Sequence, residues 1–492
     1  MTVLPQTDCR QFLRCIGLFA FLALNMGLAA PIELTPQLIT LPPNASAPRF
    51  ADVDGDGRSD LLVIDPEKKS LLIYRQRPAG FTNSPDQAIL LPPQTAWVAL
   101  CDVDAHPGLE LLMSTATGLV YSRQNAGRFE SERRTLIEAG QVFTNRDLPV
   151  LASLTTNKLG TNVLIPVISA GQTVLYQRNS AYEWSPEPPI TLNARPAVWS
   201  ADRDSDSWAM GSINPSMHQS IIPARSLRVQ QSFRAKTNQA SAKTPENDTI
   251  RRLMEDMKTN GAAGPPRITR ADVDGDGRED LVLWQIHAKL DIRTDIYLFL
   301  RGADHRLPEQ PTQVLHGRGF PIPIGPLEQP SPASDLNGDG VCELVLLKPA
   351  FAFTSPGALL EAALSRGLEW VLTIQSFDHG AFSRNPPASV PVKAFIPAED
   401  LDQWVVFLPG DFNGDGRPDL LIRRSETQWN IYFSTNDGSW FVPKPALTFN
   451  ATSPGYFEIK DLNGDGRADL IWHESDQPRL SIFLSPSPRA SR

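Results

Sequence analysis

Short apolar runs alternate with polar turns along the chain, and this pattern predicts an all-β protein. Leu61–Ile64 is such a run, the polar stretch Asp65–Ser70 follows it, and Leu71–Gln76 is the next strand-like segment. Ala88–Leu91 completes the unit as its last strand. Apolar runs bounded by turn residues are typical of buried strands. Units of this kind return about every 50 residues, which is the spacing of a propeller blade.

A nine-residue acidic phrase precedes the first apolar run of a unit and recurs along the chain. The five full copies are Asp52–Asp60, Asp272–Asp280, Asp335–Glu343, Asp411–Asp419 and Asp461–Asp469. Weaker copies start at Asp102, at Asp202 and near Ser153. Eight starting positions predict a closed β-propeller of four-stranded antiparallel blades, with eight blades preferred and seven as the alternative.

The two ends of the chain predict how the ring closes. The last unit finishes with Arg479–Leu484 and lacks a fourth strand, whereas the N-terminal segment Gln37–Pro43 resembles Gln87–Pro93 of the first unit. We therefore expect residues 37–43 to pair with the C-terminal strand, which removes the exposed edge of the last blade.

Two insertions interrupt the repeats. Residues 234–266 are polar, and within them Thr244 and Pro245 are expected to cap a helix that has Ile250, Leu253, Met254 and Met257 on one face and ends before Gly261. A second short helix is expected from Ser355 to Gly367.

The N-terminus predicts export of the chain. Arg10 and Arg14 precede the apolar stretch Cys15–Ala30, and Gly27 and Ala29 lie at cleavage spacing, as in a signal peptide. A membrane anchor is the alternative, but the stretch is shorter than the ~20 residues that span a bilayer. We expect a signal peptide at 1–29 and a β-propeller at 30–492, secreted to the extracellular space, the cell surface or the periplasm, with no membrane span in the mature chain.

Net charge and cysteine content argue against a nucleic-acid-binding protein and against a disulfide-stabilised scaffold. The formal net charge of −9 disfavours binding to nucleic acid. Once the leader is removed, Cys101 and Cys342 remain. They lie several repeats apart, so the sequence predicts no disulfide between them.

The acidic phrase has the chemistry of a calcium loop. Side-chain oxygens stand at positions 1, 3, 5 and 9, a backbone carbonyl is available at position 7, and glycine at position 6 permits a sharp turn. Oxygen ligands without sulfur or imidazole favour Ca²⁺. An EF-hand is excluded because position 12 is apolar and lies in a strand. The ligands expected in about five sites, at positions 1, 3, 5, 7 and 9, are Asp52, Asp54, Asp56, Arg58 and Asp60; Asp272, Asp274, Asp276, Arg278 and Asp280; Asp335, Asn337, Asp339, Val341 and Glu343; Asp411, Asn413, Asp415, Arg417 and Asp419; and Asp461, Asn463, Asp465, Arg467 and Asp469.

The weaker copies have lost ligands. Position 5 at the copy starting at 102 is His106 and position 6 is Pro107; the copy at 202 has Ser207 at position 6 and Met210 at position 9. We expect these loops, and the stretch near Ser153, to bind metal weakly or not at all. The five full loops are then contiguous around the ring.

These phrases resemble the FG-GAP/VCBS repeats of integrin α-subunit propellers and of secreted bacterial proteins, over about residues 37–485. The resemblance implies that the metal loops join the first two strands of each blade and lie on one face. It also implies that the opposite face binds the ligand. Glu343 departs from the usual aspartate at position 9.

Two functions fit these features. Seven scattered histidines form no His-Glu-x-x-His motif, and the chain has no Gly-x-Ser-x-Gly elbow. We expect a binding or adhesion module for a protein or carbohydrate ligand, more readily than an enzyme. The alternative is a polysaccharide lyase on an eight-bladed calcium propeller, which a cluster of Arg, Lys, His and Tyr in the central cleft would favour.

Overall fold

The computed structural model describes residues 30–138 except 96 and 116, six short strands between 150 and 210, and residues 245–258, 265–288, 292–325, 329–350, 367–383, 388–395 and 405–486. The predicted signal peptide, the predicted helix at 355–367 and the weak copy near Ser153 lie outside these residues, as does most of the copy at 202.

The described part is almost entirely β, and its repeating unit is an antiparallel four-stranded sheet. Six such units are described, four as separate sheets and two within a five-stranded and a seven-stranded sheet; they are named sheets A to F here in chain order of their first strands. Sheet A is β3 (Arg49–Ala51), β4 (Asp60–Asp65), β5 (Ser70–Tyr74) and β6 (Gln87–Leu90); sheet B is β7 (Trp97–Cys101), β8 (Glu110–Thr115), β9 (Gly118–Ser122) and β12 (Arg134–Glu138); sheet C is β19 (Arg267–Ala271), β20 (Asp280–Ala288), β21 (Ile292–Phe299) and β22 (Gln313–Arg318).

The remaining three sheets follow the same plan. Sheet D is β25 (Ala333–Ser334), β26 (Glu343–Pro349), β27 (Gly367–Gln375) and β30 (Ala388–Phe395); sheet E is β31 (Val406–Gly410), β32 (Asp419–Arg423), β33 (Gln428–Tyr432) and β34 (Leu447–Asn450); sheet F is β35 (Gly455–Lys460), β36 (Asp469–Glu474), β37 (Arg479–Phe483) and β2 (Gln37–Thr40). The prediction that the N-terminal segment completes the last sheet is confirmed, because β2 pairs antiparallel with β37 from Gln37 opposite Ile482 to Thr40 opposite Arg479.

Further strands extend or connect these sheets. β1 (Ile32–Glu33) pairs parallel with β34, and β23 (Ile322–Ile324) and β13 (Val150–Ala152) pair parallel with β31 and β7. The others form smaller pairings: β24 (Gln329–Ser331) with β23, β10 (Gln124–Asn125) with β11 (Arg128–Phe129), β28 (Phe377–Asp378) with β29 (Ala381–Phe382), β14 (Leu164–Ser169) with β15 (Gln172–Arg178) and β16 (Trp184–Pro186), and β17 (Trp199–Ser200) with β18 (Ala209–Met210).

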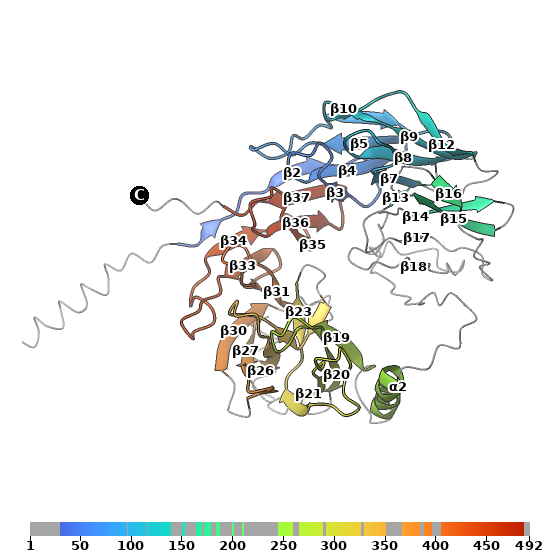
Figure 1. Cartoon of the computed structure of the whole chain (residues 1–492). Helices are drawn as coiled ribbons and strands as arrows, with labels where there is room; N and C mark the ends of the chain where they lie inside the picture. Colours follow the sequence, from blue (N-terminus) through green and yellow to red (C-terminus); the bar gives the residue numbers. More distant parts are fainter. Residues whose placement is uncertain are drawn as a thin grey trace, which may run out of the picture.

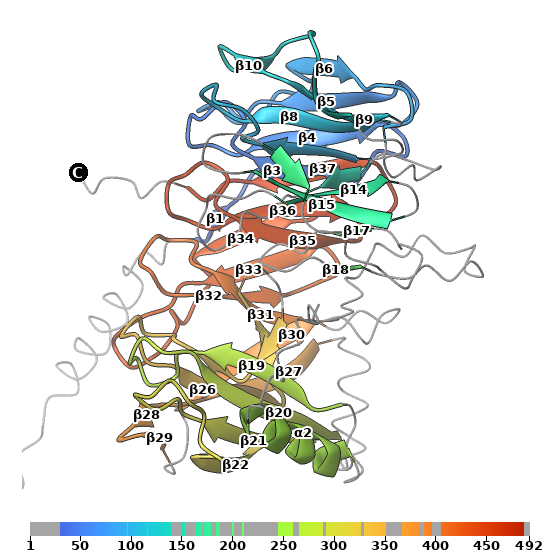
Figure 2. The same cartoon turned by 45° about the vertical axis from the view of Figure 1, so that its right-hand side comes forward.

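The sheets stack face to face around an arc. Five apolar cores each lie between two neighbouring sheets, in the order C–D, D–E, E–F, F–A and A–B. Figure 1 shows this arc, with the last sheet (red) beside the first (blue), and Figure 2 shows the same stack from a second side. All residues of β4 and β36 are buried, because both faces of these strands are covered. Continuous apolar runs are the sequence pattern of such strands.

The helix predicted in the insertion is present. α2 (Pro245–Lys258) packs on the face of sheet C that is turned away from sheet D: Met257 is buried there, and Ile250, Leu253 and Met254 are partly buried. Cys101 and Cys342 are both buried, and no disulfide joins them, as the sequence predicts. Within the described residues, no helix has the length and apolar character needed to cross a membrane.

Candidate metal centres

Each acidic phrase forms the connection between the first and second strands of its sheet. Loop A is 52–60, loop B 102–110, loop C 272–280, loop D 335–343, loop E 411–419 and loop F 461–469, named after their sheets. This is the location that the FG-GAP/VCBS resemblance implies. Because each phrase leads directly into a buried strand, position 9 of the loop is also the first residue of that strand.

The carboxylate at position 1 shapes the loop. Oδ1 of Asp52 accepts a hydrogen bond from the Gly55 amide at 2.7 Å, and Oδ2 accepts one from the Gly57 amide at 2.9 Å. Gly55 and Gly57 have φ values of 78° and 83°, a region in which only glycine is unstrained. Loops D, E and F repeat both bonds from Asp335, Asp411 and Asp461.

The carboxylate at position 9 joins the loop to the sheet. In loop E, Oδ2 of Asp419 accepts a hydrogen bond from the position-2 amide of Phe412 at 2.8 Å, and Oδ1 accepts one from the amide of Ser434 beyond β33, also at 2.8 Å. The side chain is buried, and burial raises the pKa of Asp419 to about 7 despite these two amides. For the same reason the pKa is raised to about 7 for Asp469 and Glu343 and to about 6 for Asp60.

The sequence predicts position 9 as a metal ligand, but it did not indicate that this carboxylate also joins the loop to the sheet. Each oxygen of Asp419 already accepts one backbone amide, although a carboxylate oxygen has a second lone pair for a cation. The missed signal was the position of this aspartate at the start of a fully buried strand.

The donor set of loops A and C fits a calcium ion. Asp52, Asp54 and Asp56 each offer an oxygen within 4.8 Å of the others, and Asp272, Asp274 and Asp276 do the same in loop C. Oδ1 of Asp54 is buried without a hydrogen-bond partner, which is unfavourable unless a cation contacts it. All the side-chain donors are hard oxygens, the type that Ca²⁺ prefers.

Loops D, E and F have asparagine at position 3. Asn413 accepts the Asp415 amide on Oδ1 at 2.8 Å and donates from Nδ2 to Oδ2 of Asp415 at 3.0 Å. Asn337 and Asn463 make the same pair of bonds. An amide oxygen at position 3 keeps an oxygen donor while removing one negative charge, so these loops also fit Ca²⁺.

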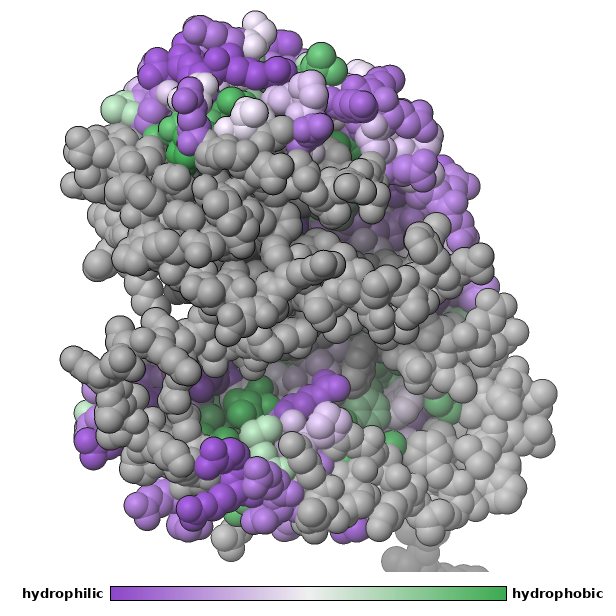
Figure 3. All heavy atoms as spheres, turned by 90° about the vertical axis from the view of Figure 1, so that its right-hand side faces the viewer, coloured by the Kyte–Doolittle hydropathy of each residue, from purple (hydrophilic) through white to green (hydrophobic). Residues whose placement is uncertain are grey.

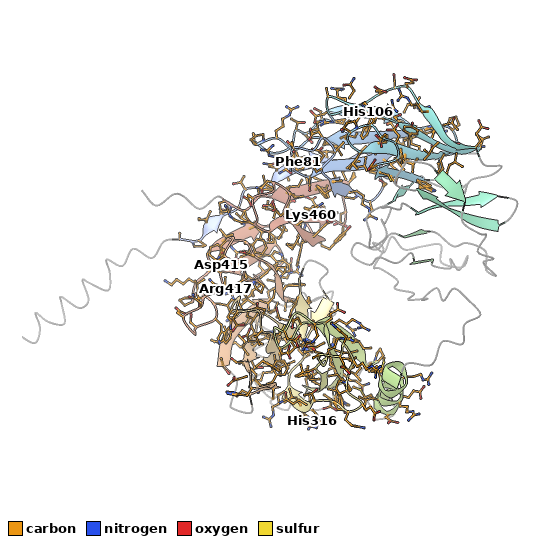
Figure 4. All side chains as sticks on the ribbon, viewed as in Figure 1. Phe81, His106, His316, Asp415, Arg417 and Lys460 are labelled. Carbon is orange, nitrogen blue, oxygen red and sulfur yellow. The ribbon has the colours of Figure 1, made fainter. Side chains whose placement is uncertain are left out.

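The side chain at position 7 has a role that the sequence did not indicate. We predicted only its backbone carbonyl as a ligand, but the guanidinium of Arg417 pairs with the position-5 carboxylate of Asp415 at 2.6 Å (Figure 4). Arg58 pairs with Asp56 at 2.7 Å, and Arg278 and Arg467 pair with Asp276 and Asp465. These partly exposed pairs reduce the repulsion between loop carboxylates.

Neighbouring loops contact one another through their backbones. The position-8 amide of Ser59 donates to the position-2 carbonyl of Leu462 at 2.7 Å, and Cys342 donates to Val273 at 3.0 Å. The position-8 amide of Ala468 donates to the Asp411 carbonyl at 2.6 Å. Loop E has Pro418 at position 8 and so has no amide to donate.

Close packing accompanies these bonds. A Cβ atom on the position-4 residue Gly464 would lie 2.5 Å from the Gly57 carbonyl oxygen, and one on Gly275 would lie 2.9 Å from that of Gly340. Gly338 and Gly414 lie against Arg417 and Arg467 of the next loop. Loops C, D, E, F and A thus form a continuous row, called the loop row below.

Loop B lacks the carboxylate at position 5 and the glycine at position 6 that the loop row has, but it is attached to its sheet by the same hydrogen bond. Oε2 of Glu110, at position 9, accepts the position-2 amide of Val103 at 2.8 Å. In loop B, position 5 is His106 and position 6 is Pro107. The contact between loop A and the segment that follows β9 is made by the side-chain amide of Gln124, which donates a hydrogen bond to the Val53 carbonyl.

Comparison with protein-family models supports the repeat that the acidic phrases define. No curated protein matches the chain significantly. Residues 411–472 match the family model described as an FG-GAP-like repeat. The matched stretch runs from loop E through loop F into β36, which is one full period of the structure. Residues 411–472 are an FG-GAP-like repeat, the family that the acidic loops predict.

Proposed function

We propose that this chain is a secreted, calcium-stabilised β-propeller that binds a protein or carbohydrate ligand. The observation that supports it best is the loop row: five loops of one design that contact each other along one side of the sheet stack. A device repeated in this way is suited to stabilising the scaffold, whereas a recognition site differs from repeat to repeat. Eight blades and a closed ring are part of this proposal.

In the proposed protein the loop oxygens hold Ca²⁺ and the ion supplies positive charge among carboxylates that otherwise repel one another. Positions 1, 3 and 5 provide side-chain oxygens and position 7 a carbonyl. Position 9 provides a carboxylate whose orientation is already set by two backbone amides in loops A, C, E and F, and by one backbone amide and the Asn337 side chain in loop D. Bound calcium would restrain the first two strands of each of five blades.

The ligand surface is proposed for the ends of the sheets that lie opposite the loops. At that end of β35, an innermost strand of the arc in Figure 1, Tyr456 is 45% exposed. An exposed aromatic ring is suited to stacking on a sugar or an apolar side chain. On the side of the molecule in Figure 3, the described residues mix hydrophilic and apolar surface in the lower half, as binding surfaces often do.

The test is a glycan array probed with the mature chain in calcium. We expect binding to at least one glycan class, weakened by Tyr456→Ala. Leu90→Ala is the matched control, because Leu90 is 65% exposed but lies on the outermost strand of sheet A. A chain that binds neither glycans nor extracellular proteins in calcium would contradict the proposed function.

One observation favours the lyase as a second candidate. The Tyr456 ring stacks on His473, with ring centroids 4.5 Å apart and planes at 3°, and Nε2 of His473 is 3.5 Å from the Glu458 carboxylate. A tyrosine and a carboxylate on β35, with a buried histidine beside them on β36, could abstract a proton from an acidic polysaccharide. Unsaturated products from an acidic polysaccharide, lost in His473→Ala, would establish the lyase; their absence leaves the binding module.

A further inference from the structure

Sheets A and B share a residue that the other described sheets lack. In sheet A, Leu61 of β4 is opposite Tyr74, and the next residue is Arg75. In sheet B, Leu111 of β8 is opposite Ser122, and the next residue is Arg123. The equivalent residues of sheets C, E and F are apolar: Leu300, Phe433 and Leu484.

In sheet B this arginine binds the loop. Nε of Arg123 donates to Oδ2 of Asp104, the position-3 carboxylate of loop B, at 2.7 Å, and Nη2 lies 2.7 Å from the same oxygen. The Asp104 side chain is 15% exposed and the Arg123 side chain 33%, so the charge pair is partly shielded from water. The guanidinium thus contacts the oxygen that a metal ion would contact in a full loop.

In sheet A the same contact occurs in a loop that is otherwise complete. Nη1 of Arg75 donates to Oδ2 of Asp54, and the two side chains are 15% and 23% exposed. Gly127, in the turn between β10 and β11, covers the pair: a Cβ atom there would lie 3.1 Å from Nη1 of Arg75 and 3.2 Å from Cβ of Asp54. Asp54 is also one of the three aspartates that converge in loop A.

We propose that a guanidinium from the second hairpin strand acts as a built-in cation of the acidic loop: Arg123 replaces the metal ion in loop B, and Arg75 makes loop A the weakest calcium site of the loop row. The inference rests on the proposed calcium binding. It follows from charge: a cation within contact distance of a ligand carboxylate repels an incoming dication and must be displaced or tolerated by it.

The two loops differ in whether calcium can still bind. Loop A keeps carboxylates at positions 1, 3, 5 and 9 and glycine at position 6, so calcium binds in the presence of Arg75 but more weakly. Loop B has lost both the position-5 carboxylate and the position-6 glycine, so within the described part of the chain Arg123 supplies the positive charge at its position-3 carboxylate. Loops C to F have apolar or small residues in this place and fill first.

The part of the proposal that concerns Arg75 and loop A is tested by titrating the wild type and Arg75→Leu with calcium in a calorimeter. Leucine is the residue that sheets C and F have at this position. We expect the weakest site to bind about tenfold more tightly, which corresponds to about 1.4 kcal/mol, the scale of one partly screened charge contact. The control is Arg77→Leu, because Arg77 pairs with Asp86 at the surface and contacts no loop carboxylate; its titration should match the wild type.

The part of the proposal that concerns Arg123 is tested by restoring the calcium-loop residues of loop B. The triple variant Arg123→Leu, His106→Asp, Pro107→Gly restores the missing ligands and removes the built-in cation, and we expect one calcium ion more than the wild type by native mass spectrometry. The double variant His106→Asp, Pro107→Gly, which retains Arg123, should gain little or no calcium at the same concentration. If the triple variant does not fold, Arg75→Leu still decides the part assigned to loop A, and Arg123→Leu alone replaces the triple variant: it should lower the urea midpoint equally in calcium and in EDTA, because no metal ion takes the place of the guanidinium.

The outcomes separate the inference from the proposed function. A wild type that binds five ions, with Arg75→Leu unchanged in its weakest site, overturns the inference and leaves the calcium propeller intact. Equal calcium uptake by the triple and double variants overturns the part assigned to Arg123. A wild type that binds no calcium overturns both the inference and the proposed function.

Discussion

Loops B and C occupy the same place in two sheets of the same design, yet of the two only loop C has the full set of oxygen donors that a calcium loop requires. Both start with an aspartate, and both use the position-9 carboxylate to accept the position-2 amide, at 2.8 Å in loop B and 2.9 Å in loop C. They differ at positions 5 and 6, where loop B has His106 and Pro107 and loop C has Asp276 and Gly277.

The comparison shows that the nine-residue acidic phrase has two separate roles, attaching the loop to its sheet and presenting oxygen atoms to a cation. Positions 2 and 9 attach the loop to its sheet, whatever the loop binds. Positions 5 and 6 differ between the two loops, and in loop B the position-3 carboxylate contacts the guanidinium of Arg123. A sheet of this design therefore keeps its loop attachment after the loop has lost a carboxylate and a glycine.

The largest expected effect is the removal of calcium from the whole loop row. At a free calcium concentration about tenfold above the dissociation constant, each site stabilises the fold by roughly 1.4 kcal/mol, and five sites by ~7 kcal/mol. This is comparable to the total stability of a typical domain, ~5–15 kcal/mol. We expect calorimetry to show a much lower melting temperature in EDTA, restored by calcium.

Magnesium at equal concentration is the control for chelation. Magnesium requires octahedral geometry and keeps its water ligands, so it should restore little of the melting temperature. An unchanged melting temperature in EDTA would contradict the prediction that the loop row binds calcium and loop B does not.

Single-loop substitutions sharpen the comparison. Asp276→Ala should cost about 1.4 kcal/mol in calcium, one site's share, and little in EDTA. Asp104→Ala should cost a similar amount in both conditions, because it leaves the partly buried guanidinium of Arg123 without its carboxylate. Urea unfolding in calcium and in EDTA measures both. An Asp276→Ala cost that is equal in the two conditions would show that loop C is structural only.

A smaller effect is expected from the bonds between loops. Ala468→Pro removes the amide that donates to the Asp411 carbonyl, and we expect a loss of about 1 kcal/mol. Proline fits the position, because Pro418 occupies it in loop E. Ala468→Ser, which keeps the amide, is the control. Equal unfolding midpoints for the two variants would contradict a role for this bond.

The smallest expected effect concerns pH in the absence of metal. Burial raises the pKa of Glu110 in loop B and of Asp419 in the loop row to about 7, well above the values near 4 of unfolded carboxyls. The folded chain therefore takes up protons before the unfolded chain does, and its stability in EDTA should rise as the pH falls from 8 to 6. In saturating calcium the loop-row carboxylates stay ionised, so this gain should be smaller. A lower urea midpoint at pH 6 than at pH 8 in EDTA would contradict this.

Much of the fold was predictable because the signals are local and repeated. The apolar run Leu61–Ile64 lies within the buried strand β4, the segment starting at Gln37 pairs with the C-terminal strand, and the α2 helix has its apolar face where the spacing of Ile250, Leu253 and Met257 requires. The loop positions and their oxygen donors were predictable for the same reason.

The rest of the site depends on contacts between residues far apart in sequence. Nothing near loop A in the sequence indicates that Arg75 reaches Asp54, or that Ser59 donates to Leu462 some four hundred residues away. These contacts arise only when the sheets stack and the first and last sheets become neighbours. The shift of Asp419 to a pKa near 7 likewise results from burial between sheets.

The most direct test of the central claim is the calcium content of the purified chain after dialysis against millimolar calcium, measured by native mass spectrometry. The loop row predicts five ions per chain, and four in Asp276→Ala; Asp104→Ala should retain five. A chain that holds no calcium, or that loses an ion in Asp104→Ala and none in Asp276→Ala, would contradict the account.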